Sequence, residues 1–259
     1  MSIDASPARP SGVSNAAWAL AVLCLVLAIG DAIAGLFSGI GYRLDLWSYR
    51  NGLGALRYVF WLATVTAALA ALATILGAST GRTGAVVVGG IAMVIAGITA
   101  YIPWNLRQIV NSVPPIHDIS TDLENPPQFV RVATLRKTSD HSVAYAGPEA
   151  AALQKKGYPD IAPIVLRAPP DKVFETAKAV LASMALQIVD ADPAQGRLEA
   201  TDTSFLFGFE DDIVVRIVAG ADGTSRVDVR SKSRVGRSDL GINAGRIRVF
   251  TTTLRKKLA

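Results

Sequence analysis

Three long apolar stretches within the first 104 residues constrain this 259-residue chain more than any other feature. They run from about residue 16 to 40, from 58 to 76 and from 85 to 102. The hydrocarbon core of a bilayer is about 30 Å thick, so a spanning helix needs roughly 20 mainly apolar residues. The pattern therefore predicts three transmembrane helices within residues 16–104, preceded by a flexible tail over residues 1–15.

A cleaved lipoprotein signal is the alternative for the first stretch, because Cys24 follows an apolar run. Lipid attachment requires a small residue before the cysteine, whereas this chain has Leu23, and the apolar run continues to Ile40. The pattern favours an uncleaved helix with the cysteine packed inside it. A single cysteine forms no internal disulfide, so it leaves the redox compartment undecided.

The orientation of three spans follows from the basic residues of the short loops. An odd number of spans places the N-terminus and the large C-terminal part on opposite faces. The first loop carries three basic residues, and the tail and second loop carry two: Arg43, Arg50 and Arg57 against Arg9 and Arg82. This margin of one residue places the large domain in the cytoplasm.

Asp31 is the only acidic or basic residue inside the apolar stretches. A carboxylate at this depth is costly and usually faces other helices or a water-filled cavity, so it could mark a proton or ion path. The alternative is a polar contact in close helix packing, because Gly30, Gly35 and Gly39 are nearby, or an interfacial pair with Arg43. The other two spans contain no second charge, which favours a structural contact.

The part of the chain after the spans is long enough to fold around its own core. Residues 105–127 are rich in Pro, Asp and Ser, which predicts an extended linker. Residues 128–259 form the predicted soluble domain. They begin their regular pattern with a short apolar strand at 161–167, followed by a helix that starts at Pro170.

Alternating apolar and polar residues then predict four more strands, over residues 186–190, 196–205, 212–218 and 225–233. A last helix begins at about Ser238. The order strand, helix, four strands, helix indicates an antiparallel sheet of about four to five strands packed by two helices. The predicted class is therefore α+β, with a three-helix transmembrane region in front of the soluble domain.

Positive charge is concentrated at the C-terminal end, where residues 226–259 contain ten basic and two acidic residues. On the strand 225–233, the charged residues alternate with Val227 and Val229, so we expect the charged face to be solvated or to line a polar groove. Ser231 and Ser233 fall on the apolar side, where buried hydroxyl groups need hydrogen-bond partners.

The turn after this strand is a candidate anion-binding or partner-binding site. Arginines flank Gly236, and the following helix start offers free backbone amides to a phosphate or carboxylate. The structural alternative is that Ser238 caps the helix, Asp239 lies at its positive end and pairs with an arginine, and Asn243 ties a turn. A carboxylate at this place would repel an anion, which favours the structural alternative. The candidate residues are Arg230, Arg234, Arg237, Ser238, Asn243 and Arg246.

The sequence contains only isolated candidates for catalytic residues. His117 stands beside Asp118, but neighbours on an extended chain point in opposite directions, so a catalytic dyad would need a special turn. His141 could supply a second imidazole. Asp211 and Asp212 could supply carboxylates, although acidic residues before a strand more often cap a turn. The residues suggest no metal site and no cofactor, and the basic end lacks the interleaved aromatic residues of a nucleic-acid-binding surface.

Two segments carry a resemblance to a known family. The sequence DDIVVRI, with RSKSRVGRSDLGINAGRI after it, resembles the signature of the domain of unknown function 1499 family. The upstream segment PPIHDISTDLENPPQF is similar to that of its membrane-anchored members, and the likeness covers roughly residues 114–258. No activity is established for the family. Many members are exported as lipoproteins or behind membrane helices, so the resemblance implies a multi-pass protein of the bacterial inner membrane with a periplasmic domain, against the loop count.

Two hypotheses follow from these observations. The first is a non-enzymatic, membrane-anchored accessory module whose basic C-terminal face engages a membrane or periplasmic protein, or an anionic lipid or glycan. The second is a hydrolase of an envelope substrate that uses His117 and a carboxylate. A pocket in which this histidine, an arginine and a carboxylate converge would favour the hydrolase, and a flat basic face would favour binding.

Overall fold

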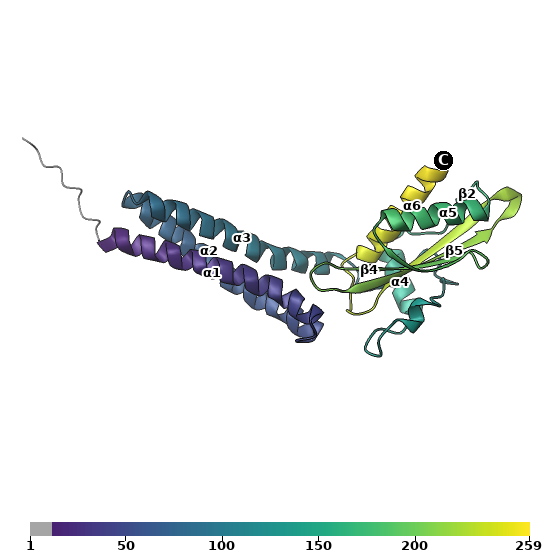
Figure 1. Cartoon of the computed structure of the whole chain (residues 1–259), viewed down its shortest axis with the longest axis horizontal. Helices are drawn as coiled ribbons and strands as arrows, with labels where there is room; N and C mark the ends of the chain where they lie inside the picture. The colour runs from purple at the N-terminus through teal and green to yellow at the C-terminus, as the bar shows by residue number, and fades with distance from the viewer. Residues whose placement is uncertain (1–11) are drawn as a thin grey trace, which may run out of the picture. The chain divides into compact units, whose positions relative to one another are not determined.

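The computed structural model describes residues 12–259, which divide into two compact units after Gln108 (Figure 1). The flexible tail predicted over residues 1–15 lies mostly outside the described residues. Residues 12–15 instead form the first turn of a helix.

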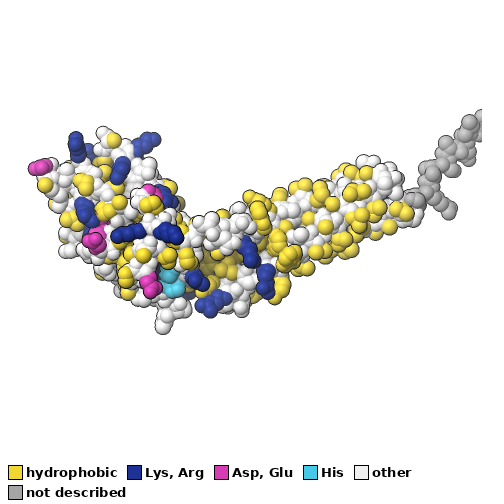
Figure 2. Space-filling model, turned by 180° about the vertical axis from the view of Figure 1, so that it is seen from behind, with side chains coloured by type: hydrophobic (Ala, Val, Ile, Leu, Met, Phe, Trp, Pro, Cys, Tyr) yellow, Lys and Arg dark blue, Asp and Glu magenta, His cyan; other side chains and the backbone are white. Residues whose placement is uncertain are grey.

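Three long helices make up the first unit: α1 (Gly12–Arg43), α2 (Tyr49–Ser79) and α3 (Thr83–Ser112). Each is long and apolar enough to span a membrane, so the three predicted apolar helices are present. Hydrophobic side chains are spread along the helices on the face seen in Figure 2. The helices extend beyond the predicted ranges because their ends continue into the polar residues of the connections.

Small side chains form the contacts between these helices, as is usual where lipid removes the hydrophobic drive for association. A cluster of small buried residues joins all three helices: Cys24, Ala28, Ala70, Ala92 and Ala96. At Gly89 a Cβ atom would lie 2.5 Å from the Thr74 hydroxyl oxygen, so only glycine permits this approach. Thr66 donates a 2.9 Å hydrogen bond to Asp31 across α1 and α2, as the structural alternative for this carboxylate expects.

The second unit contains an antiparallel sheet of six strands with helices packed on it, which confirms the α+β class. The spatial order is β1-β6-β5-β4-β3, and β2 pairs with the same edge of β6 as β1 does. The strands are β1 (Asp118–Ser120), β2 (Ile164–Leu166), β3 (Gln187–Asp192), β4 (Arg197–Thr203), β5 (Glu210–Ala219) and β6 (Ser225–Ser233). The helices are α4 (Pro148–Gly157), α5 (Pro170–Ser183) and α6 (Ile242–Leu258), with short 3-10 turns at Val132–Thr134 and Ala221–Gly223.

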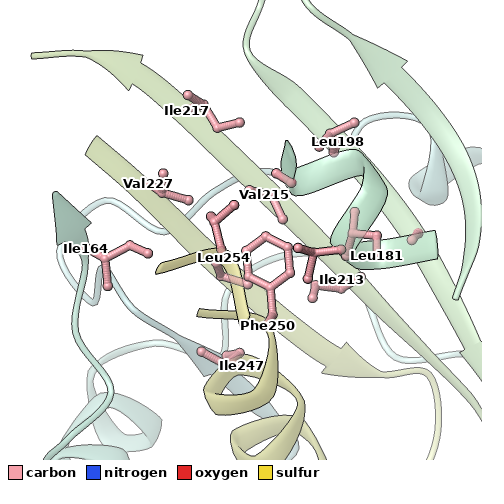
Figure 3. Packing of buried hydrophobic residues seen from close by; sticks show 14 of the residues in the cluster. Ile164, Leu181, Leu198, Ile213, Val215, Ile217, Val227, Ile247, Phe250 and Leu254 are labelled. Atoms are coloured by element: carbon pink, nitrogen blue, oxygen red, sulfur yellow. The ribbon is translucent and has the colours of Figure 1, made fainter. Parts of the chain in front are cut away.

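One face of the sheet carries the hydrophobic core. The apolar residues of β5 point into it together with those of β4 and β6, and α5 and α6 cover this face (Figure 1). Phe250 and Leu254 of α6 pack against Val215 and Val227 of the sheet, and Leu181 of α5 completes the cluster (Figure 3). These residues are at most 1 % exposed, so this face is fully desolvated.

Several element boundaries differ from the sequence predictions. The strand β1 lies inside the predicted linker 105–127, and it is too short to show an alternating pattern. The helix α4 was not predicted. Its Gln154 side chain accepts from the backbone amide of Ser120 at 3.0 Å and donates to the carbonyl of the same residue at 2.6 Å, so α4 covers the outer edge of β1.

Strand register places several polar residues at one end of the sheet. Asp118 pairs with Lys232, Asp211 pairs with Ser233, and Thr203 pairs with Glu210. These residues therefore share the end at which the chain passes from α3 into β1, which we call the tether end. The loops 204–209 and 234–241 leave the sheet at this end. The strand β4 ends at Thr203, whereas the sequence predicted an end at Phe205.

Candidate functional site

The second face of the sheet is charged and buried, although the sequence predicted that it would be solvated or line a groove. Residues 121–147, which we call the cover segment, lie over it. The charged face consists of Asp118 on β1, Glu199 and Thr201 on β4, Asp212 and Arg216 on β5, and Asp228, Arg230 and Lys232 on β6. All of these except Arg216 are buried.

Arg230 and Asp118 form a bidentate ion pair at the centre of this face. The guanidinium Nε and Nη2 atoms donate to the two carboxylate oxygens at 2.8 and 2.9 Å, and both side chains are 0 % exposed. Lys232 Nζ lies 3.0 Å from the same carboxylate. Burial alone would raise the pKa of Asp118, but Arg230 and Lys232 hold this pKa below its ordinary value. Asp118 is therefore ionised, and both of its carboxylate oxygens are paired with basic groups.

The same arginine also binds the cover segment. It donates to the carbonyl of Pro127 at 3.2 Å and to that of Val143 at 2.9 Å, and the ring of Phe129 lies 5.0 Å from its guanidinium carbon. Tyr145 stacks on the guanidinium from 5.4 Å. The arginine thus joins the middle of the sheet to both halves of the cover segment.

Asp212 is the centre of a second cluster. Arg234 donates to it with Nε at 3.0 Å and Nη2 at 2.9 Å, and Arg136 of the cover segment donates with Nε at 3.0 Å. Thr201 donates its hydroxyl at 2.7 Å. One buried carboxylate thus faces two guanidinium groups. Arg234 reaches a second carboxylate, Glu210, at 2.8 Å.

Glu199 binds the cover segment through backbone amides. Its carboxylate accepts from the amides of Val130 and Val132 at 2.7 Å each and from that of Arg131 at 3.2 Å. These amides begin the 3-10 turn Val132–Thr134, where free donors attract a negative charge. No sequence pattern marks this contact, because the two partners lie 67 to 69 positions apart.

Arg246 of α6 lies on the other side of the sheet and pairs with two carboxylates, Asp202 at 2.6 Å and Asp211 at 2.9 Å. Its neighbour Asn243 accepts from Ser231 at 2.6 Å and donates to Ser233 at 3.0 Å. The two serines on the apolar side of β6 therefore have the partners that buried hydroxyl groups require.

The loop 234–241 does not present free amides to an anion. The carboxylate of Asp239 accepts from the amides of Gly241 at 3.1 Å and Asn243 at 2.7 Å, and it occupies the start of α6. Gly241, in the left-handed conformation, is the N-cap, so Ser238 does not cap the helix. Arg237 is the one exposed residue among the six candidate binding residues, all of which the structure describes.

The two histidines of the chain come together at the tether end. The rings of His117 and His141 stack with centroids 4.3 Å apart, and His141 Nε2 lies 2.9 Å from the carbonyl oxygen of Gly236. Histidine atoms are visible on the surface of this face of the domain (Figure 2). Burial lowers the pKa of His117, and the charges of His141 and Lys232 lower it further.

The candidate catalytic residues do not converge on one point in the described part of the chain. Asp118 turns to the charged face while the ring of His117 turns to His141, as neighbours on a strand do. Asp211 and Asp212 point to opposite faces, toward Arg246 and Arg234 respectively. Within residues 12–259, no group of three or more His, Cys, Asp or Glu side chains is arranged to hold a metal ion.

The comparison with known families agrees with the arrangement of this unit. A family model described as "Protein of unknown function (DUF1499)" matches residues 118–254, more than half of the chain. The chain belongs to the DUF1499 family. No curated protein matches the chain. The matched range begins at the first residue of β1 and ends in the last two turns of α6, so it contains the whole sheet and the whole cover segment.

Several residues that organise the DUF1499 domain were not identified from the sequence. Glu199 and Arg136 are buried in ion pairs or hydrogen bonds, yet each stands in a segment without a recognisable motif. The side-chain amide of Gln154 binds the backbone of β1 on its outer edge, where a neighbouring strand would otherwise pair. The one indirect signal is the alternation of charged and apolar residues over 225–233, which indicates that the second face of the sheet is charged but not what covers it.

We predict that Asp212→Asn strongly destabilises the DUF1499 domain, because two buried arginines would then face a neutral amide. Loss of one partner of a buried ion pair costs about 3–5 kcal/mol of unfolding free energy. The matched control is Asp160→Asn, which breaks an exposed pair with Arg248 and costs at most about 1 kcal/mol. Hydrogen exchange of the β5 and β6 amides in the full-length protein measures both. Equal losses in the two variants would contradict the assignment.

We further predict that His117 titrates below the ordinary histidine value of about 6.5. The folded state then binds this proton less readily than the unfolded chain. The contribution of neutral His117 to the unfolding free energy is therefore fully present above the ordinary histidine pKa, and it is lost as the pH falls through the folded-state pKa. The ring signals of ¹³C-labelled histidine in the full-length protein report both imidazoles. His141→Gln removes one opposing charge and should raise the His117 pKa; titration at or above 6.5 in the unaltered chain would refute the prediction.

Proposed function

We propose that this chain is a multi-pass protein of the bacterial inner membrane whose DUF1499 domain is a periplasmic, non-enzymatic binding module. The three apolar helices and the resemblance to exported family members support the location. The neutralised interior of the domain supports a structural role for its charges. The proposed partner is a membrane or periplasmic protein, of which this chain would be an accessory subunit.

The observation that carries this proposal is the internal pairing of the candidate arginines. Arg230, Arg234 and Arg246 each meet at least one carboxylate within the domain, and each is buried. Anion recognition by these groups would require that an internal ion pair be broken, which leaves an uncompensated buried charge. These arginines therefore stabilise the fold. We assign the binding role to basic residues that are exposed on the surface of the domain.

The hydrolase hypothesis gains no support from the same geometry. A general base needs a nucleophile within hydrogen-bond reach and an orienting partner. The stacked ring of His117 lies against a second imidazole, and the neighbouring Asp118 is occupied by Arg230 and Lys232. The site lacks the convergence of histidine, arginine and carboxylate that would favour chemistry.

The last turn of α6 carries three consecutive basic residues on the surface of the domain. Arg255, Lys256 and Lys257 are exposed, and no ion pair engages them within the described part of the chain. Arg255 borders a groove of about 210 Å³ between α6 and the segment before β2, which Thr251 and Thr252 also line. An acidic segment of a partner protein complements this surface in charge.

The basic turn lies at the end of α6 that is farther from the tether end. The helix begins after the loop 234–241 at the tether end, and its last turn lies about 20 Å farther along the helix axis. We assign this turn to a partner protein, because an acidic segment complements it in charge.

The prediction is that the full-length protein loses its partner when Arg255, Lys256 and Lys257 are all replaced by glutamine. A photo-crosslinking residue at Thr252 in the unaltered chain should yield a defined protein adduct in cells, and the triple variant should lose most of it. The charge-matched control replaces Lys156, Lys172 and Lys178, which are exposed elsewhere on the domain.

The competing explanation is that the three cations only stabilise the C-terminal end of α6, where each contributes about 0.3–1 kcal/mol. That explanation predicts lower stability of the α6 variant and an unchanged adduct. Retention of the adduct in this variant, or its equal loss in the control, would disprove a binding role for the basic turn.

A further inference from the structure

The short strand β2 forms an open edge of the sheet. It pairs with β6 on one side, and within the described residues no strand pairs with its other side. Ile164 lies at the margin of the buried cluster, beside Val227 of β6 (Figure 3). The middle residue of the strand, Val165, is 66 % exposed. An edge of this kind presents backbone groups to which another chain can pair.

Strand register shows which backbone groups of β2 point outward. The amide of Thr121 donates to the carbonyl of Val229 at 2.9 Å, so Val229 faces the outer edge of β6. Hydrogen-bonded and non-bonded pairs alternate along an antiparallel ladder. Val227 therefore faces the same edge and exchanges hydrogen bonds with its register partner, Ile164. Val165, the next residue, directs its amide and its carbonyl away from the sheet.

A groove runs along this edge on the side of α6. It has a volume of about 210 Å³ and lies between the helix and residues 160–164, which lead into β2. Thr251, Thr252 and Arg255 form its helical wall. Side chains of an extended strand alternate between the two faces of a sheet. A strand added beside β2 would therefore send every second side chain toward this groove.

The other face of the same edge carries a row of exposed side chains. Val165 lies beside Arg226 of β6, which lies beside Val218 of β5. Val218 is 48 % exposed, and the side chain of Arg226 is 46 % exposed. A hollow of about 430 Å³, lined by residues 121–124 of the cover segment, also borders Pro163 and Arg226. An added strand would extend this row with its remaining side chains.

The charge around the edge is mainly positive. Asp160 is the one acidic residue that lines the groove, and Arg248 already pairs with it at 2.6 Å. The groove continues into the basic last turn of α6 through Arg255. An acidic segment complements this surface, and a basic segment does not. The exposed basic residues at and around the edge are Arg167, Arg226, Arg248, Arg255, Lys256 and Lys257.

We propose that β2 accepts an acidic, extended segment of the partner protein as an additional strand of the sheet. This inference rests on the proposed function and specifies how the partner is recognised. Main-chain hydrogen bonds to Val165 provide the attachment, and the hollows on the two faces receive alternate side chains, as in other cases of strand addition. The basic turn of α6 binds the acidic side chains that lie on its face of the sheet.

The experiment measures amide exchange of the ¹⁵N-valine-labelled full-length protein in phosphatidylcholine nanodiscs, with and without an octapeptide of alternating Glu and Val. The inference predicts that the amide of Val165 exchanges about tenfold more slowly, or slower still, when the peptide is bound. The amide of Val227 is the internal reference, because it is already paired with β2. The control peptide carries N-methyl groups on alternate residues, so it keeps the charge and loses the donors on one edge.

Two substitutions separate backbone pairing from side-chain contact. Val165→Pro removes the outward amide and should weaken binding of a fluorescent form of the octapeptide about tenfold. Val165→Ala keeps the amide and should retain binding. Unchanged exchange at Val227 in the proline variant shows that β2 still pairs with β6, so a loss of binding is not a loss of folding.

The competing explanation is that β2 is short and follows Pro163 because such an edge resists pairing. That explanation predicts no peptide binding, or binding without protection of Val165, and either result would overturn the inference. Equal binding of the N-methylated peptide would do so too, as would protection of Val165 without peptide, which indicates a second copy on the edge. Val165 protection that persists when Arg255, Lys256 and Lys257 are replaced by glutamine would instead count against the basic turn alone.

Discussion

The ion pair of Arg230 and Asp118 is the contact on which the rest of the domain depends. It joins the central strand β6 to the edge strand β1, and the same guanidinium binds the cover segment through the carbonyls of Pro127 and Val143. A charge buried to this degree is costly unless it is paired and hydrogen-bonded. The fold meets this condition, because the arginine finds acceptors on the sheet and on the segment above it.

This sheet is therefore buried on two faces by different means. The α5 and α6 side relies on hydrocarbon, with Phe250, Leu254 and Val215 fully desolvated. The other side relies on charge, with Asp118, Asp212 and Glu199 as three separate anchors for an irregular segment. Because the hydrophobic contribution on that side is limited to a small cluster around Phe129, Val132 and Val214, the ionic contacts determine how the cover segment lies. This division accounts for the large number of titratable residues that the domain buries.

Periodicity predicted the three long helices, the helix at Pro170 and the sequence-adjacent strands, since each depends on local pattern and on turns such as 219–224. It could not predict that β1 pairs with β6, because three residues carry no alternation and their partner lies more than a hundred positions later. The same limit applies to the site. Arg230 and Asp118 were both recognised as notable, but for separate roles, and pairing between distant charges is visible only in three dimensions. The partners of Glu199 are backbone amides, which leave no mark in the sequence.

Amide hydrogen exchange of the full-length Glu199→Gln variant tests most directly whether charge holds the cover segment on the sheet. The substitution keeps the shape of the side chain and removes the charge that the amides of Val130 and Val132 contact. Hydrogen bonds to charged groups contribute about 1.5–3 kcal/mol, so the account predicts that these amides exchange roughly tenfold faster or more, while β5 and β6 keep their protection. Unchanged exchange at both amides, or an equal loss of protection throughout the sheet, would contradict it.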